Sequence, residues 1–421
     1  MMGNAILTGN TKSPAYYIWI SSLIALMVLG GYAHFMSLIT SQEIMEFSIR
    51  IPWAMMVSNY VFLVVSSTGL CIVSSLGHLL GMKRYELISR RCVFLAFITI
   101  IFGMTSIVLH LGHPERALVY SIITPNLGSA IWWMGAFYSF YILFIAVEYW
   151  FLARVGLAKT ANNATGLKQK IYRLMVARKT DESPESLKKD HKWTRIAGGL
   201  ALIFGLSAHN TLGAVFGHTE ARAFWYGPYY PVYFLFSAAF CGYAWLITAT
   251  IITYKVKGKE IPGKLKKLLF EMGKIFALLL CIGLLFTSYK LGYGLLDPAK
   301  AKSILLLLNG PFSQPFWLFE IAIGSVLPII ILLYAASKEN IGGLLTASIM
   351  VLIGVFVMRF DFLVVGEVYP MFSPMGKDAL VLVPSFFPVL MEIFVIAGIF
   401  GVLFLSYTLG VQFLPLEEEM S

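Results

Sequence analysis

The stretch RRCVFLAFITIIFGMTSIVLHLGHPER, residues 90–116, decides the class of the fold. Two arginines precede an uncharged run of about 20 residues, the length that crosses the hydrocarbon core of a membrane as one helix. The run ends in two histidines, a glutamate and an arginine, all within residues 110–116. The stretch therefore predicts a membrane-spanning helix with costly polar chemistry at one end.

The composition of the whole chain agrees with this prediction. Of the 421 residues, 58% are hydrophobic and only 13% are charged, and the mean hydropathy is +0.77. An ordinary soluble domain carries about 25% charged residues. In a membrane protein a net charge of +10 indicates topology and contact with anionic lipids, so no nucleic-acid partner is expected. We expect an all-α integral membrane protein that forms one polytopic domain over residues 1–421.

Apolar runs predict about ten transmembrane helices. The predicted spans are 15–40, 52–80, 91–112, 127–153, 195–217, 231–254, 268–290, 316–336, 341–359 and 384–411. The loops between them are mostly short, which favours packing of antiparallel neighbours. We therefore expect a first four-helix bundle over 52–217, a second over 231–359, and two extra helices.

Lysine and arginine cluster on one side of these spans. The basic segments are 81–91, 154–194, 254–267 and Lys338, and the loops on the opposite side are poor in both residues. The positive-inside rule places the basic loops in the cytoplasm. We expect a multi-pass protein of the cytoplasmic membrane with cytoplasmic N- and C-termini, in which 154–194 is a basic cytoplasmic loop.

The remaining polar residues gather at the outer ends of the spans. His110 lies about one turn inside its apolar run, and His209 and Asn210 lie about two turns inside theirs. Ionisable groups within a membrane commonly mark ligand or proton pathways. A buried structural hydrogen bond is the alternative for all three residues.

Further candidates lie nearer the membrane surface or among small residues. His113 and Arg116 follow the apolar run, where Pro114 ends the helix, and a plain polar turn also explains them. Trp133 also fits an aromatic belt. Thr68, in VVSSTGLC, also fits close helix packing around Gly69.

Three ionisable residues near the C-terminus are candidates for a proton path. Arg359 and Asp361 flank Phe360, and a mutual ion pair is their alternative role. Glu392 lies deep in the last predicted span, where a lone carboxyl group would be protonated or paired.

Three classes of chemistry fit these residues. A quinone site needs hydrogen-bond partners for two oxygens and a proton exit, and histidine suits it because it titrates near neutral pH. A b-type haem needs two facing histidines, but no span has two histidines about thirteen residues apart in one helix. An ion or proton transporter is the third class, although the spans lack the paired Gly/Pro-broken segments of a midplane substrate site.

The cysteines argue against a cluster held by this chain. None of the four belongs to a CxxC pair, which disfavours an iron–sulfur or zinc site, so no metal site is predicted. They are Cys71, Cys92, Cys241 and Cys281, each in or at the end of an apolar run, and we expect them to be small buried residues.

Several stretches resemble a known family in their order and spacing. They are IPWAMMVSNYVFLVVSSTGLCIVSSLGH (51–78), LHLGHPERALVY (109–120), SAIWWMGAFY (129–138), LSAHNTLGAVFGHTEARAFWYGPYYPVYFLFSAAFCGYA (206–244) and LVPSFFPVLMEIFVIAGIFG (382–401). The chain resembles the NrfD/PsrC family, the membrane subunits of polysulfide reductase-like and related quinone-linked complexes. VVSSTGLCIVSSLGH is most similar to the branch from Dsr complexes (DsrP), which accompany dissimilatory sulfite reduction.

The resemblance implies two four-helix bundles, no haem, and a quinol site near the outer face of the first bundle. It implies a ferredoxin-like iron–sulfur subunit docked outside the membrane, with other membrane and cytochrome subunits and lipids as further partners. The histidine of the family's span-five motif falls on His209, and the glutamate of its PS…E motif falls on Glu392. In the complex III branch a span-two histidine replaces Ser67 or Thr68 and an aspartate replaces His110, so the proton route of that branch does not transfer directly.

We therefore expect a quinone-interacting membrane anchor subunit of a respiratory electron-transfer complex. It would exchange electrons between menaquinol and an extracytoplasmic iron–sulfur subunit, in sulfur or sulfite metabolism, and would bind no haem or iron–sulfur cluster itself. His110 and His209 are the expected catalytic residues. The expected quinone-binding residues are Thr68, His110, His113, Arg116, Trp133, Tyr138, His209 and Asn210. A b-type haem cytochrome subunit and a proton- or ion-translocating transporter remain alternatives.

Overall fold

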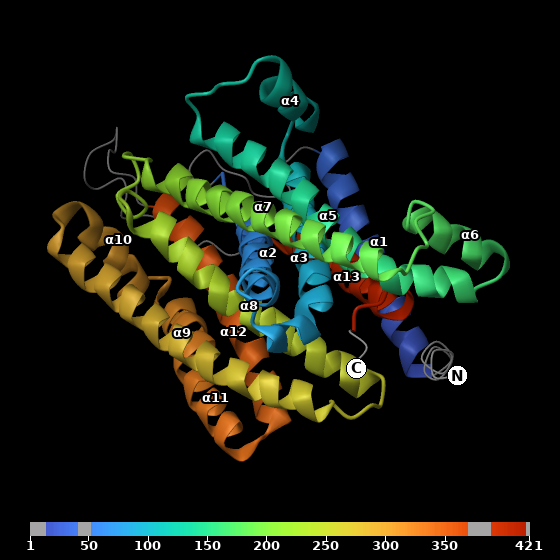
Figure 1. Cartoon of the computed structure of the whole chain (residues 1–421). Coiled ribbons are helices and arrows are strands. Elements are labelled where there is room, and N and C mark those ends of the chain that lie inside the picture. Colours follow the sequence, from blue (N-terminus) through green and yellow to red (C-terminus); the bar gives the residue numbers. More distant parts are fainter. Residues whose placement is uncertain (1–13, 41–51, 369–388, 418–421) are drawn as a thin grey trace.

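The computed structural model describes residues 14–40, 52–368 and 389–417. These residues form helices and no strands, and ten helices are long and apolar enough to cross a membrane, which confirms the predicted fold class. The ten are α1 (Pro14–Thr40), α2 (Met55–His78), α3 (Lys83–His110), α5 (Ala130–Asn163), α7 (Pro184–Gly217), α8 (Tyr229–Val256), α9 (Gly263–Leu296), η3 with α11 (Pro315–Val326 and Leu327–Lys338), α12 (Ile341–Val368) and α13 (Leu390–Phe413) (Figure 1).

Four short helices connect these spans. They are α4 (Pro114–Leu118), η2 (Val119–Ile123), α6 (Gly166–Met175) and α10 (Pro298–Leu308). Helices α7 and α10 begin with proline in the first turn and a capping side chain before it. The Ser183 hydroxyl accepts a hydrogen bond from the Ser186 N–H at 3.3 Å before α7, and the Asp297 carboxylate accepts one from the Ala299 N–H at 3.0 Å before α10.

The spanning helices pack in two groups around α2. The first group is α2, α3, α5 and α7, and the second group is α8, α9, η3–α11 and α12. Helix α1 packs against α13 beside the first group. In Figure 1, α9 and α11 lie on one side of the molecule and α1 on the other. The division into two bundles bounded by 52–217 and 231–359 stays a prediction.

The two groups meet where α2 crosses α8. A Cβ atom on Gly69 would lie 1.8 Å from the carbonyl oxygen of Ala238, and one on Gly242 would lie 2.2 Å from the carbonyl carbon of Gly69. Neither glycine can therefore be replaced without moving a backbone. The packing predicted around Gly69 is present, and it brings the two helix backbones into direct contact.

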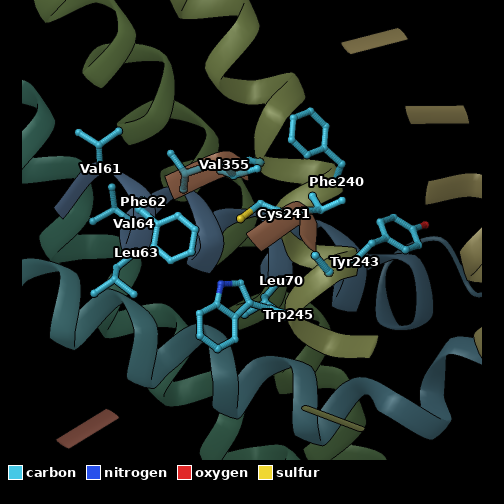
Figure 2. Packing of buried hydrophobic residues seen from close by; sticks show 14 of the residues in the cluster. Val61, Phe62, Leu63, Val64, Leu70, Phe240, Cys241, Tyr243, Trp245 and Val355 are labelled. Carbon is cyan, nitrogen blue, oxygen red and sulfur yellow. The ribbon is translucent and has the colours of Figure 1, made fainter. Parts of the chain in front are cut away.

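The core beside this crossing is built from both groups. Figure 2 shows Phe62 and neighbouring α2 residues beside Cys241 and Trp245 of α8. The indole N–H of Trp245 donates a hydrogen bond to the Ser66 hydroxyl at 2.9 Å. The Ser66 hydroxyl also lies 3.2 Å from the Cys241 sulfur, so two polar contacts join the two helices within a largely apolar contact.

The cysteines follow the prediction with one exception. Cys71, Cys92 and Cys241 are buried, as expected for small apolar residues in helix contacts. Cys281 is exposed, so the expectation of burial is wrong for this residue. It lies on α9, which also carries the exposed residues Leu278 and Leu285.

The segment 154–194, predicted as a basic loop, is mostly helical because α5 and α7 extend into it and α6 lies between them. Arg154 holds the segment together from a nearly inaccessible position, 2% exposed. Its Nε donates to the Asp190 carboxylate at 2.7 Å, and its Nη1 donates to the backbone carbonyls of Lys179 at 3.0 Å and Asp181 at 2.8 Å. This buried ion pair joins α5 and α7 at the ends of these helices that carry the basic segment 154–194.

Candidate functional site

Three of the predicted quinone-binding residues meet inside the first group. His209 of α7 lies with its Nδ1 3.1 Å from the Thr68 hydroxyl of α2 and 3.4 Å from the Tyr138 hydroxyl of α5. All three side chains are completely buried, at 0% exposure. We call Thr68, Tyr138 and His209 the His209 site.

The depth of this site follows from the position of His209 in its helix. His209 lies about 12 Å before the end of α7 at Gly217, at 1.5 Å per residue. One turn earlier, Gly205 lets α7 approach α5, because a Cβ atom there would lie 3.2 Å from the Tyr141 ring. The small residue thus positions α7 close enough to α5 for the hydrogen bond between His209 and Tyr138.

The atom of the site that can bind a ligand is the second ring nitrogen of His209. Nε2 is buried and has no hydrogen-bond partner among the described residues. A neutral imidazole offers one donor and one acceptor nitrogen, and leaving a buried one unpaired is costly. The ring can therefore exchange a hydrogen bond or a proton with the hydroxyl group of a ligand. Phe234, with its ring centroid 6.5 Å from that of His209, and Tyr60, 6.5 Å from Tyr138, supply aromatic surface nearby.

A second polar layer lies beside the site and was not predicted. The Tyr141 hydroxyl lies 2.8 Å from the Ser67 hydroxyl, and the Ser67 hydroxyl donates to the Ala96 carbonyl at 2.6 Å. Two turns further along α5, Glu148 is 2% exposed and its Oε2 has no hydrogen-bond partner among the described residues. A single carboxylate in the apolar run FYILFIAVEYWF was the sequence signal for it.

His110 lies at the end of its helix, which differs from the expected position one turn inside the span. Helix α3 ends at His110, and the backbone is extended at Leu111 because Gly112 and Pro114 do not continue the helix. His110 is half-buried, and the hydrogen-bond partners of His209 are Thr68 and Tyr138, so the two histidines are not joined directly. The catalytic role of His110 stays a prediction.

The other predicted quinone-binding residues are exposed and lie apart from the His209 site. Asn210 follows His209 by about 100° around the helix and is exposed, so it does not share the buried hydrogen bonds of the His209 site, and its role in quinone binding stays a prediction. Trp133 is 42% exposed and donates to the Leu127 carbonyl at 2.9 Å.

His113 and Arg116 are exposed as well. They belong to residues 111–128, which are exposed throughout and include α4, the helix that projects at the top of Figure 1. His113 lies 3.0 Å from the Glu115 carboxylate. Hydrogen bonding from its own backbone N–H, with a smaller effect of His113, lowers the pKa of Glu115. These surroundings are those of a polar turn, which is the alternative to a quinone-binding role for both residues.

In the second group, Arg359 and Asp361 do not form the ion pair considered for them. The Arg359 guanidinium donates to the Ser237 hydroxyl at 2.5 Å and lies 4.6 Å from the centroid of the Phe234 ring. Both carboxylate oxygens of Asp361 are buried without a hydrogen-bond partner among the described residues. The two side chains leave α12 in different directions, because residues two positions apart in an α-helix lie about 200° apart around its axis.

Two further charged residues of this group were missed. Lys290 of α9 and Glu320 of η3 line the same cavity as Arg359 and Asp361. Each is one charged residue in an apolar sequence, FTSYKLGYG and FWLFEIAIG, and this was the available signal.

Glu392 occupies a different position from the one expected. It is completely buried but belongs to the first turn of α13, because this helix begins at Leu390, so its placement deep in the last span is wrong. A carboxylate near a helix N-terminus is favoured by the helix dipole. Glu392 does not line the cavity that contains Arg359 and Asp361. Residues 384–388, the predicted start of the span, lie outside the described residues.

The sequence of the chain matches a family of known proteins. A family model described as "Polysulphide reductase, NrfD" matches residues 43–370. The chain belongs to the NrfD family. This confirms the resemblance found in the sequence, and the nearer likeness to Dsr complexes stays a prediction.

Individual relatives of this NrfD-family chain match almost its whole length. The C subunit of the selenate reductase from Mesobacillus selenatarsenatis is 27% identical over 95% of this chain and 93% of its own. The Hdr-like menaquinol oxidoreductase integral membrane subunit of Archaeoglobus fulgidus is 24% identical over 96% and 94%. A putative dimethyl sulfoxide reductase membrane subunit of Halobacterium salinarum is 22% identical over 95% and 91%. The chain is thus similar to membrane subunits of reductase and menaquinol oxidoreductase complexes.

Proposed function

We propose that this chain is the quinol-binding membrane subunit of a respiratory oxidoreductase complex. It exchanges electrons between menaquinol and an iron–sulfur subunit on the outer side of the cytoplasmic membrane, and its termini lie in the cytoplasm. The observation that carries the proposal is the buried Nε2 of His209, which has no hydrogen-bond partner in the described part of the chain, while Nδ1 of the same ring contacts Thr68 and Tyr138. The relative named as a menaquinol oxidoreductase subunit supports menaquinol as the ligand.

The residues of the His209 site fit the needs of a quinol. When bound, menaquinol would supply two electrons and two protons. His209 would accept one proton at Nε2, while its Nδ1 stays hydrogen-bonded to Thr68 and Tyr138. These two hydroxyl groups hold the orientation of the imidazole and stabilise the positive charge that it gains. The surrounding buried helices exclude water from this proton transfer.

Other residues predicted from the sequence have supporting roles in this proposal. His110, at the outer end of α3, would contact the ligand on its way from the outer surface, and Arg116 would shape the mouth. The buried Asp361, together with Arg359 and Glu392, would serve a proton path through the second group and the neighbouring α13. Sulfur or sulfite metabolism is the proposed setting of the complex.

Binding of a quinol analogue by the purified chain tests the site directly. Replacing His209 with phenylalanine keeps a buried ring but removes both nitrogens, so we expect binding to weaken about tenfold, the effect of one lost hydrogen bond of about 1–1.5 kcal/mol. A fluorescence titration with the analogue measures the dissociation constant. Ile203→Phe is the matched control, because Ile203 is an exposed residue of the same helix, α7. Equal binding by the His209→Phe variant and the wild type would remove the basis of the proposal.

The exposed outer segment fits the docking of the iron–sulfur subunit. Ile122 and Ile123 are 73% and 72% exposed beside the charged residues of α4. An isoleucine buried at an interface contributes about 1.5–3 kcal/mol, or roughly 10- to 100-fold in affinity. We expect Ile123→Asp to weaken binding of the partner by about this factor, measured as iron that co-purifies with the chain. Leu174→Asp on α6 alters an equally exposed residue, 77%, on the inner side and should leave the iron content unchanged.

A further inference from the structure

The second group encloses a small cavity with an unusual set of charges. It has a volume of about 20 Å³ and is lined by two cations and two carboxylates, Lys290, Arg359, Glu320 and Asp361. One water molecule needs about 10–15 Å³ of such space, whereas sites for organic ligands span about 300–1,000 Å³. The cavity therefore fits about one or two water molecules and excludes a quinone or another organic substrate.

A second cavity of about 20 Å³ continues from the first. Glu320 lines both cavities, together with Tyr233, Thr287 and Met358. Beyond Glu320 the second cavity is lined by Ser325 and by the glycines Gly283, Gly324 and Gly354. Glu320 is the titratable carboxylate that borders both spaces, so a proton that passes between them through water meets its side chain.

The charges in the first cavity are held apart instead of being paired directly. The Lys290 ammonium lies 3.8 Å from the centroid of the Phe224 ring and 4.6 Å from that of Tyr230, so aromatic faces hold it. Both carboxylate oxygens of Asp361 are buried without a hydrogen-bond partner among the described residues, and the half-buried carboxylate of Glu320 makes no hydrogen bond or ion pair to a described residue. A buried carboxylate without a partner is costly unless it binds a proton or water.

The backbone at Glu320 is specialised as well. Glu320 lies within η3, a π-helical stretch, and such stretches are rare and occur frequently at functional sites. The Ser325 hydroxyl donates a side-chain hydrogen bond to the Glu320 carbonyl at 3.1 Å. The charged groups that share its cavity are Lys290 of α9 and Arg359 and Asp361 of α12, and α8 contributes the tyrosine hydroxyls of residues 229, 230 and 233.

From this arrangement we infer that Glu320 is a proton-storage site, which takes up one proton from water in one cavity and releases it to water in the other. The proton adds to a carboxylate oxygen, and no electron moves in this step. Lys290 stabilises the carboxylate form after release, and water is the ligand of both cavities. The relay lies in the second group, apart from the His209 site.

A shared ring connects this relay to the His209 site. Phe234 has the Arg359 guanidinium 4.6 Å from its centroid and the His209 ring centroid 6.5 Å away. A proton gained by His209 adds positive charge near Arg359, and this charge favours release of the proton from Glu320. This coupling rests on the proposed quinol function, whereas storage at Glu320 does not.

Infrared difference spectra of the purified full-length chain, recorded between low and high pH, test the storage site. We expect a carboxylic-acid carbonyl band that shifts in heavy water, and one component of this band should be lost in Glu320→Gln, while the components from other buried carboxyl groups such as Asp361 remain. Glu320→Asp keeps a carboxyl group and should restore the band at a shifted position, which separates proton storage from a general defect in folding. Glu220→Gln, an exposed glutamate of an outer loop, is the matched control and should leave the band unchanged. An identical band in Glu320→Gln and the wild type would overturn the inference.

The coupling has its own readout. Addition of the quinol analogue should change the amplitude of the Glu320 band in the wild type and not in His209→Phe. If the analogue binds without changing the band, the coupling is wrong although storage stands. If the analogue fails to bind the wild-type chain, the proposed quinol function is wrong, while the pH-difference band still decides storage at Glu320.

Discussion

Replacing His209 with glutamine will lower the rate of quinol oxidation by the intact complex by about 10²- to 10⁴-fold, the usual contribution of a general base. Glutamine keeps a hydrogen-bonding side chain among Thr68 and Tyr138 but cannot accept a proton near neutral pH. The loss should therefore appear in kcat, with a much smaller change in KM. Steady-state kinetics with a soluble quinol and an artificial electron acceptor measure both constants.

A conservative change at the neighbouring residue separates orientation from proton transfer. Thr68→Val removes one hydroxyl group that lies 3.1 Å from His209, so we expect a loss of about tenfold, corresponding to about 1–1.5 kcal/mol. The critical result is which of the two variants, His209→Gln or Thr68→Val, loses more activity. If His209→Gln costs no more than Thr68→Val, the histidine only positions the ligand and the proton is accepted elsewhere.

Replacing Arg154 with alanine will destabilise the chain by about 3–5 kcal/mol, the cost of leaving one partner of a buried ion pair alone. The Asp190 carboxylate is 8% exposed and would lose its charge partner, and the carbonyls of Lys179 and Asp181 would lose their donor. Chemical denaturation of the purified protein in detergent measures the free energy of unfolding. Arg84→Ala is the control, because the Arg84 side chain is 56% exposed in its pair with Glu271 and should change stability by about 0–1 kcal/mol.

The double variant Arg154→Met with Asp190→Leu tests the mechanism of this loss. Because it removes both charges from the buried position, it should be more stable than Arg154→Ala. A double variant that is as unstable as the single one would point to lost packing and lost carbonyl contacts as the cause.

Hydropathy alone was sufficient to predict the spans, because the cost of an unsatisfied backbone in lipid allows few other structures. It could not predict which faces of the helices meet. His209 and Asn210 are adjacent in the sequence, yet one is buried at the site and the other is exposed, and this depends on how α7 is rotated against α2 and α5. A family motif identified His209, and only the helix packing brought Thr68 and Tyr138 to it.

The charged residues of the second group could be noticed one by one in the sequence, but the sequence does not show that they lie together. Lys290 and Glu320 are separated by thirty positions in the sequence and by a short outer helix, α10, so no local pattern joins them. Glu148 and Glu320 could have been noticed as single carboxylates in apolar runs. The surroundings of both residues depend on contacts between helices. Glu148 lies against a glycine of α7, and Glu320 borders two water-sized cavities.

The crossing of α2 and α8 determines how the two helix groups can communicate. Because Gly69 and Gly242 leave no space between the two backbones, lengthwise sliding of one helix past the other would drive any neighbouring side chain into the opposing backbone. The crossing therefore fixes the first group, for which we propose quinol binding, relative to the second group, for which we propose proton storage. Coupling between the two groups would then be electrostatic, between charges on either side of Phe234 at a constant separation, and would not involve sliding of one helix along the other.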